Sequence, residues 1–212
     1  MNEVHTLPDP AAADASETGG DLAATIASRI CHDIVSPLGA IANGVELLLL
    51  SGAERTPELD LIAESVEGAN ARIRAFRLAF GASRGRAVGG KEIASILRGL
   101  EKTSRLSYDW APPADHPREE VKAVFLLMQC MESALPMGGR IRVARDGPAW
   151  IVEAEGPRLR IQPTVWDAVG PARAAPPDLA ALVQFAVLPG VLDSLGRRLD
   201  LRLGPERIEA RF

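Results

Sequence analysis

Residues 26–48 read IASRICHDIVSPLGAIANGVELL, and this stretch decides the fold of the first part of the chain. Its large apolar side chains recur at steps of three and four residues, which is the spacing of one face of an α-helix. The members of this stripe are Ile26, Ile30, Ile34, Leu38, Ile41, Val45 and Leu48. The pattern predicts one long helix that begins near Asp21, buries this stripe and ends at the turn signal Ser51-Gly52.

A second helix is predicted directly after this turn. Thr56 can cap it, Pro57 suits the first helical position, and Glu58 suits the positive end of the helix. Its apolar stripe runs from Leu59 to Phe80, and the short connection predicts an antiparallel helical hairpin. Because a lone hairpin exposes much apolar surface, we expect two chains to pair their hairpins into a dimeric four-helix bundle. The protein is therefore expected to be a homodimer.

Composition divides the chain into four regions. Residues 1–20 are rich in Ala, Pro, Asp, Glu and Gly without apolar periodicity, which predicts a disordered tail. The hairpin occupies residues 21–82, and residues 83–90 (SRGRAVGG) form a predicted linker. The remaining residues, 91–212, form a second domain.

The second domain mixes the patterns of helices and strands. Helices are predicted at 91–100, 118–135 and 179–199. Strands are predicted at 104–110, 140–144, 150–154, 200–203 and 207–212. We expect an α/β sandwich in which helices cover an antiparallel sheet, so the whole chain belongs to the α+β class.

Charge and composition exclude several classes of partner. The net charge of -4 argues against nucleic acid or an anionic membrane surface. Cys31 and Cys130 lie among apolar residues without metal-ligand or disulfide spacing, which is typical of a reduced cytosolic protein. No apolar run approaches the roughly 20 residues that span a bilayer, and the N-terminus has no basic-then-apolar leader pattern. We therefore expect a cytoplasmic protein without a membrane partner.

His32 is the strongest candidate for chemistry. On a helix at about 100° per residue, it lies away from the apolar stripe on a face shared with Arg29, Ser36 and Asn43. A phosphoacceptor histidine needs a neutral ring nitrogen, access for a bulky partner, and a group that holds its second nitrogen. An exposed histidine followed directly by Asp33 meets these needs.

Residues 32–41 (HDIVSPLGAI) resemble the H-box of sensor histidine kinases, in which a phosphorylated His is followed by an acid and, five positions on, by Pro. Pro37 has no N–H, so it frees a backbone carbonyl near His32 and bends the helix locally. The resemblance continues into the second domain. Residues 126–134 look like the kinase helix with the Asn-containing N box, and residues 155–159 look like its Asp-x-Gly-x-Gly loop.

The residues with which those kinases bind ATP are replaced. Ser133 stands where an Asn holds Mg²⁺, Ala154 where an Asp binds the adenine amine, and Arg158 where the second loop glycine should be. Residues 176–182 (PPDLAAL) replace a glycine-rich phosphate loop, so backbone amides cannot approach phosphates closely. Together these departures predict that the chain does not bind ATP and holds no cofactor or metal of its own.

An H-box hairpin followed by a degenerate ATPase-like domain is similar to the ChpT family of histidine phosphotransferases. The resemblance covers nearly the whole chain after the tail. It implies a phosphorelay in which the receiver domain of a hybrid histidine kinase phosphorylates His32, which then phosphorylates the receiver domains of response regulators. The receivers would supply Mg²⁺, so the carrier has only to position its histidine.

The resemblance also implies roles for single residues. His32 is the phosphoacceptor, and Asp33 orients or polarises its imidazole. The residues expected to contact the incoming receiver are Arg29, Ser36, Pro37 and Asn43. Further contacts from the second domain are expected from Arg158, Arg160 and Arg173. Each of these docking residues has a simpler interpretation as an ordinary surface side chain.

The same H-box leaves other functions open. The chain could be an active sensor-type histidine kinase with an unusual nucleotide site. It could also be a non-catalytic scaffold that sequesters receivers. A phosphatase activity on receivers would use the same helical surface and could coexist with transfer.

Overall fold

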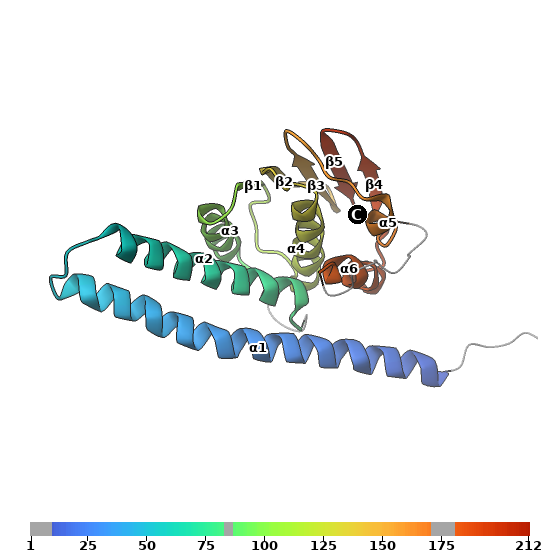
Figure 1. Cartoon of the computed structure of the whole chain (residues 1–212). Coiled ribbons are helices and arrows are strands. Elements are labelled where there is room, and N and C mark those ends of the chain that lie inside the picture. Colours follow the sequence, from blue (N-terminus) through green and yellow to red (C-terminus); the bar gives the residue numbers. More distant parts are fainter. Residues whose placement is uncertain (1–9, 83–86, 171–180) are drawn as a thin grey trace, which may run out of the picture.

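Two long helices form an antiparallel hairpin that lies along one side of an α+β domain (Figure 1). The computed structural model describes residues 10–82, 87–170 and 181–212, with side chains from residue 25 onward. Helix α1 spans Pro10–Leu50 and helix α2 spans Pro57–Phe80. The predicted hairpin is confirmed. Thr56 caps α2, because its side-chain oxygen accepts a hydrogen bond from the Leu59 amide at 3.4 Å.

Helix α1 begins earlier than the sequence predicted. Residues 10–20 are assigned to this helix, residues 1–9 lie outside the described residues, and the extent of the disordered tail stays a prediction. Alanine at positions 11, 12, 13 and 15 has the highest helix propensity of all residue types, and Pro10 suits the first helical position. These preferences outweigh the unfavourable Gly19-Gly20 pair.

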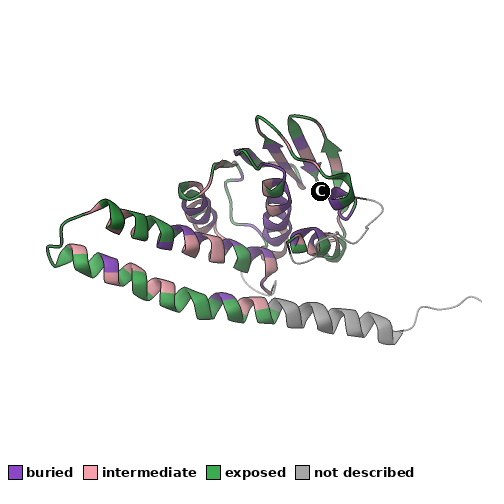
Figure 2. Ribbon diagram, in the orientation of Figure 1, coloured by how far each residue is buried: buried purple, intermediate pink, exposed green. Residues whose placement is uncertain are grey.

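The predicted apolar stripe of α1 is not buried within a single chain. Five of its members are between 42 % and 53 % exposed: Ile26, Ile30, Ile34, Ile41 and Leu48. We call these five residues the isoleucine face. The least exposed residues of α1 belong to a neighbouring face, which includes the other two stripe residues, Leu38 and Val45; its remaining members are Ala27, Cys31, Ala42 and Leu49. This second face packs against α2, and the isoleucine face remains uncovered (Figure 2).

The second domain is built on a five-stranded mixed sheet with strand order β1-β2-β3-β5-β4. Its elements are α3 (Gly90–Lys102), β1 (Leu106–Trp110), α4 (Arg118–Ser133), β2 (Gly139–Asp146), β3 (Ala149–Glu155), α5 (Pro163–Trp166), α6 (Val183–Ser194), β4 (Asp200–Leu203) and β5 (Arg207–Arg211). The α+β class is confirmed. The expectation of a purely antiparallel sheet is wrong, because β1 and β2 run parallel. Helix α4 connects these two strands and forms the crossover that a parallel pair requires.

The last helix is shorter than the predicted range of 179–199. Helix α6 ends at Ser194, and Gly196 adopts a left-handed conformation with φ of 63° that stops the helix. Residues 179 and 180 lie outside the described residues.

The core of the second domain surrounds α4. This helix packs against α2, α6 and the strands β2 and β3, and most of its side chains are buried. Trp150 is fully buried beneath it, and the His116 ring meets Trp150 edge-on at a centroid distance of 4.8 Å. Burial lowers the pKa of His116, so its ring is neutral at neutral pH. Both cysteines, Cys31 and Cys130, are free and buried, as the sequence predicted.

Residues Thr25–Leu50 of α1 are long and apolar enough to cross a membrane. Length and composition are the whole basis of this match, and helices of soluble proteins also satisfy both criteria. Here the helix carries Arg29, His32 and Asp33 near its middle and packs along α2.

Helices α2 and α3 approach each other very closely. A Cβ atom at Gly68 of α2 would lie 2.2 Å from a methyl carbon of Thr103, and one at Gly99 of α3 would lie 2.5 Å from the Cβ of Ala71. Neither position has space for a side chain. The two glycines therefore set the distance between the hairpin and the second domain.

We predict that Gly99→Ala destabilises the protein by about 1–3 kcal/mol, because the added methyl overpacks a helix contact that cannot yield without moving α2. Gly190→Ala is the matched control. Gly190 also lies inside a helix, α6, but a Cβ there meets nothing within 4 Å. This control should leave the stability unchanged or raise it by about 0.5–1 kcal/mol. Urea unfolding measures the free energy of unfolding of both variants. Equal effects of the two substitutions would contradict the packing argument.

Candidate functional site

His32 projects into solvent from the middle of α1. Its side chain is 80 % exposed, whereas its neighbour Cys31 is buried against the hairpin. The sequence expectation that His32 projects towards solvent is thus confirmed. A bulky partner can approach this ring without any rearrangement of the chain.

Two neighbouring side chains orient the His32 ring. Nδ1 of His32 lies 3.3 Å from Oδ1 of Asp33, and Nε of Arg29 donates to Oδ2 of the same carboxylate at 2.9 Å. The hydrogen bond from His32 is the largest cause that lowers the pKa of Asp33, with a smaller contribution from Arg29. Asp33 is therefore a carboxylate at neutral pH and accepts a proton-bearing Nδ1.

The contact with Asp33 distinguishes the two ring nitrogens. In a neutral imidazole one nitrogen carries the proton and the other carries a lone pair. Because Nδ1 donates to Asp33, the lone pair lies on Nε2. Among the described residues no hydrogen-bond partner of Nε2 is present. Nε2 is thus the available nucleophile.

Four further residues were expected to contact a receiver. Ser36, Pro37 and Asn43 are all exposed on α1, and the Asp33 carbonyl lacks its helical donor because Pro37 has no N–H. Arg29 is exposed as well, but its guanidinium is already engaged by Asp33. The structure places these side chains within reach of one partner, and their role in docking stays a prediction.

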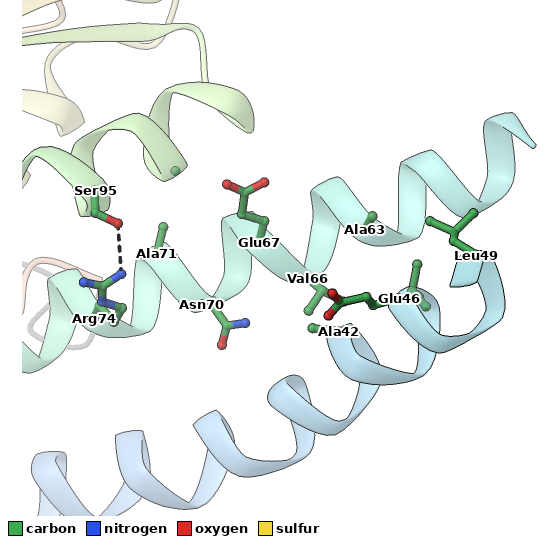
Figure 3. A pocket seen from close by; sticks show the side chains of 12 residues that line it. Ala42, Glu46, Leu49, Ala63, Val66, Glu67, Asn70, Ala71, Arg74 and Ser95 are labelled. Atoms are coloured by element: carbon green, nitrogen blue, oxygen red, sulfur yellow. Dashed lines mark hydrogen bonds between the residues drawn. The ribbon is translucent and has the colours of Figure 1, made fainter. Parts of the chain in front are cut away.

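Two grooves flank α1. The hairpin groove, of about 380 Å³, lies between α1 and α2 and is bordered by α3. Figure 3 shows Ala42 and Glu46 of α1 opposite Val66 and Asn70 of α2, with the bond from Arg74 to Ser95 of α3 at one side. The domain groove, of about 630 Å³, lies between the hairpin and helices α4 and α6. Ile30 and Cys31, directly before His32, form part of its wall.

The positions that resemble a nucleotide site have other contacts here. Ser133 uses its hydroxyl to donate to the Cys130 carbonyl of its own helix at 2.6 Å. Ala154 is fully buried in the sheet, and Arg158 is exposed. Arg160 is also exposed, whereas residues 176–180 and Arg173 lie outside the described residues. In the part of the chain that the structure describes, no cluster of His, Cys, Asp or Glu is arranged to hold a metal ion.

Beside Ser133 the structure shows a network that the sequence analysis missed. Glu132 accepts a hydrogen bond from Arg72 at 3.1 Å and another from the Tyr108 hydroxyl at 2.8 Å. Both Arg72 and Glu132 line the domain groove. No local pattern announces this contact, because its members are 60 and 24 residues apart.

Comparison with known proteins decides the family. A model of the histidine phosphotransferase C-terminal domain matches residues 90–207. The chain is also 33 % identical over 150 residues to the protein phosphotransferase ChpT of Brucella abortus (strain 2308), covering 68 % of this chain and 71 % of the relative. The chain belongs to the ChpT-type histidine phosphotransferases. This family's partners are proteins of two-component signalling.

Solved structures agree with this membership. A bacterial phosphotransferase matches with a TM-score of 0.61 and 26 % identity, over 87 % of this chain and 91 % of the other. The Acinetobacter baumannii histidine kinase AdeS matches with a TM-score of 0.42 and 12 % identity, over 82 % of this chain and 92 % of the other. The match to the bacterial phosphotransferase supports the ChpT-type fold, an α+β fold with N-terminal helices, as the fold of this chain.

The pKa of Asp33 provides a test of the site geometry. We predict that a carbon-13 NMR titration finds it below the ordinary aspartate range, since its carboxylate is hydrogen-bonded by His32 and Arg29. A lowered folded-state pKa means that these contacts are present above the ordinary range and are lost as the pH falls through the lowered value. His32→Gln should raise the pKa more than Arg29→Gln does. An Asp33 pKa that His32→Gln leaves unchanged would contradict the contact between the ring and Asp33.

Proposed function

We propose that this chain carries a phosphoryl group on His32 between the aspartates of two receiver domains in a phosphorelay. The observation that carries the proposal is the exposed ring whose Nδ1 is held by Asp33 and whose Nε2 points to solvent. Family membership supports it, since histidine phosphotransferases act on partners of this kind.

The chemistry balances without a cofactor in this chain. Nε2 attacks the phosphorus of a receiver's aspartyl phosphate, the phosphorus–oxygen bond to the aspartate breaks, and the aspartate leaves as a carboxylate. Asp33 stabilises the positive charge that develops on the ring through the Nδ1 proton. The same steps in reverse transfer the phosphoryl group from Nε2 to the aspartate of a second receiver. Mg²⁺ in each receiver neutralises the transferring oxygens.

We also propose that the second domain does not bind ATP. Glu132 and its partner Arg72 line the domain groove, and Ser133 and Ala154 lack the groups that would hold Mg²⁺ and adenine. The phosphoryl donor is then always an external receiver. An active histidine kinase remains the main alternative, and a receiver-binding scaffold is the second.

The hairpin groove supports a docking site for a receiver helix. Its floor is apolar, and Ala42 at its near end lies ten residues beyond His32, or about 15 Å along the helix. A compact domain of roughly 100 residues has a radius of gyration of about 13 Å, so one receiver can cover both places. Ser36 and Pro37 lie between them on α1, and Asn43 directly follows Ala42. This arrangement would align the receiver's aspartate with Nε2.

The isoleucine face supports a homodimer. Ile62 and Phe76 of α2 are exposed as well, so both helices of the hairpin present large apolar side chains to solvent. An exposed apolar surface of this length is typical of an association interface. A second hairpin packed on this surface forms the four-helix bundle and leaves His32 accessible. Such a dimer, with a net charge of -4 per chain, fits a cytoplasmic protein whose partners are neither nucleic acid nor membrane.

We predict that Ile34→Asp disrupts the dimer, because it places a charge in the centre of a buried apolar interface. Analytical ultracentrifugation should find twice the 22.6 kDa of one chain for the wild type and a monomer for the variant. Leu47→Asp is the matched control, since Leu47 is 65 % exposed on α1 but outside the isoleucine face. A control that dissociates equally, or a variant that stays dimeric, would refute the interface.

The decisive experiment mixes the chain with a radiolabelled phosphoreceiver. We predict that the wild type acquires acid-labile phosphohistidine and that His32→Gln acquires none while keeping its fold. The variant should still bind the receiver, which separates loss of chemistry from loss of docking. Labelling of the wild type by ATP and Mg²⁺ alone would identify a kinase. Receiver binding without any labelling would identify a scaffold.

A further inference from the structure

Helix α2 belongs to both parts of the molecule. It packs on α1 within the hairpin and on α3 and α4 of the second domain (Figure 1). Motion of the second domain relative to His32 therefore has to break contacts of α2. These contacts comprise the close approach at Gly68 and Gly99 and two groups of charged side chains.

The first group holds the end of α2. Arg118 of α4 donates from Nε to the Ala82 carbonyl at 2.9 Å and from Nη2 to the Arg77 carbonyl at 3.1 Å. Lys122 donates to the Gly81 carbonyl at 3.0 Å and is only 8 % exposed. Carbonyls at the end of a helix lack intrahelical donors and carry partial negative charge. Two cations of α4 thus bind one carbonyl in the last turn of α2 and the carbonyls of the two residues that follow the helix.

The second group holds the middle of α2. Arg72 of α2, Glu132 of α4 and Tyr108 of β1 meet in one network, in which Glu132 accepts from both partners at 3.1 and 2.8 Å. The Glu132 side chain is 16 % exposed, so solvent screens this contact less than a surface ion pair. Burial and the adjacent Glu132 raise the pKa of Tyr108 far above its ordinary value, and the phenol keeps the proton that it donates.

We infer that Arg72 and Glu132 are positioning residues, which hold the second domain in a fixed place against the hairpin so that a receiver docking at His32 meets one preformed surface. This inference rests on the proposed function. A domain that holds a bound phosphoryl donor has to move toward the histidine that it phosphorylates. A carrier that is loaded by a separate protein needs no such movement and gains from a rigid docking surface.

The expected consequence is a change in recognition rather than in chemistry. A second domain released from α2 has to be ordered each time that a receiver binds. The free-energy cost of this ordering weakens the binding of the receiver. His32, Asp33 and Arg29 lie on α1 and do not contact the network. Loss of the network should therefore raise KM for the phosphorylated receiver and leave kcat unchanged.

The substitution Glu132→Gln tests whether the contact with Arg72 fixes the second domain. It keeps the shape of the side chain and an acceptor for Tyr108, but it removes the charge that pairs with Arg72. We expect KM for the phosphorylated receiver to rise about three- to tenfold with unchanged kcat. The charge-reversed pair Arg72→Glu with Glu132→Arg should recover part of the loss. Arg98→Ala, at an exposed position of α3, is the matched control and should not change KM. Tyr108→Phe provides a second, milder variant if Glu132→Gln does not fold.

A distance measurement separates this inference from the proposed function. Spin labels at Glu64→Cys of α2 and Arg198→Cys of the second domain report the distribution of distances between the two parts in chains diluted with unlabelled protein. We expect a narrow distribution in the wild type and a broader one in Glu132→Gln. An unchanged distribution, or a fall in kcat at constant KM, would overturn the inference. If the wild type acquires no phosphohistidine, the proposed function fails and the distance distribution alone decides whether the network fixes the domain.

Discussion

The packing of α2 against three neighbours is the constraint on which the rest of the structure depends. On one side α2 supports the helix that bears His32, and on the others it contacts α3 and α4. Its approach to α3 is so close that Gly68 of α2 and Gly99 of α3 have no room for a side chain. The hairpin and the second domain therefore share a helix instead of being joined by a linker alone. The position of the domain groove beside Ile30 and Cys31 follows from this shared helix.

The exposure of His32 has a simple origin in the helix period. Helix α1 uses one face of small side chains to contact α2, presents the isoleucine face beside it, and leaves its remaining side for polar residues. The side chains that contact and orient the ring, Asp33 and Arg29, lie within about one helical turn of the histidine. Local sequence dictates this geometry, and tertiary structure has merely to keep the polar face uncovered.

The difference between local geometry and tertiary contacts explains which features the sequence predicted. The hairpin, the Thr56 cap and the exposed His32 follow from residues close together in the chain, and all three are confirmed. Five of the seven stripe residues of α1 are exposed in the single chain. Periodicity identifies an apolar face but does not identify the surface that covers it. Helical residues 10–20 were missed since composition alone was weighed.

Features that depend on distant pairs could not be predicted in this way. The parallel pairing of β1 with β2 depends on the path of α4 between them. The contact of Glu132 with Arg72 joins residues 60 positions apart, and neither residue type is unusual where it stands. Absent motifs predicted a lost nucleotide site, whereas the carboxylate that lines the groove became visible only in three dimensions.

The open setting of the His32 ring also governs how long a loaded carrier would survive. Water would reach a phosphoryl group on Nε2 as easily as a protein does, but its attack is accelerated by a base that activates the water and a cation that neutralises the phosphoryl oxygens. Asp33 lies on the Nδ1 side of the ring, and Arg29 is bound to Asp33. Neither would therefore promote hydrolysis, and a phosphorylated carrier would keep its phosphoryl group until an unphosphorylated receiver arrives.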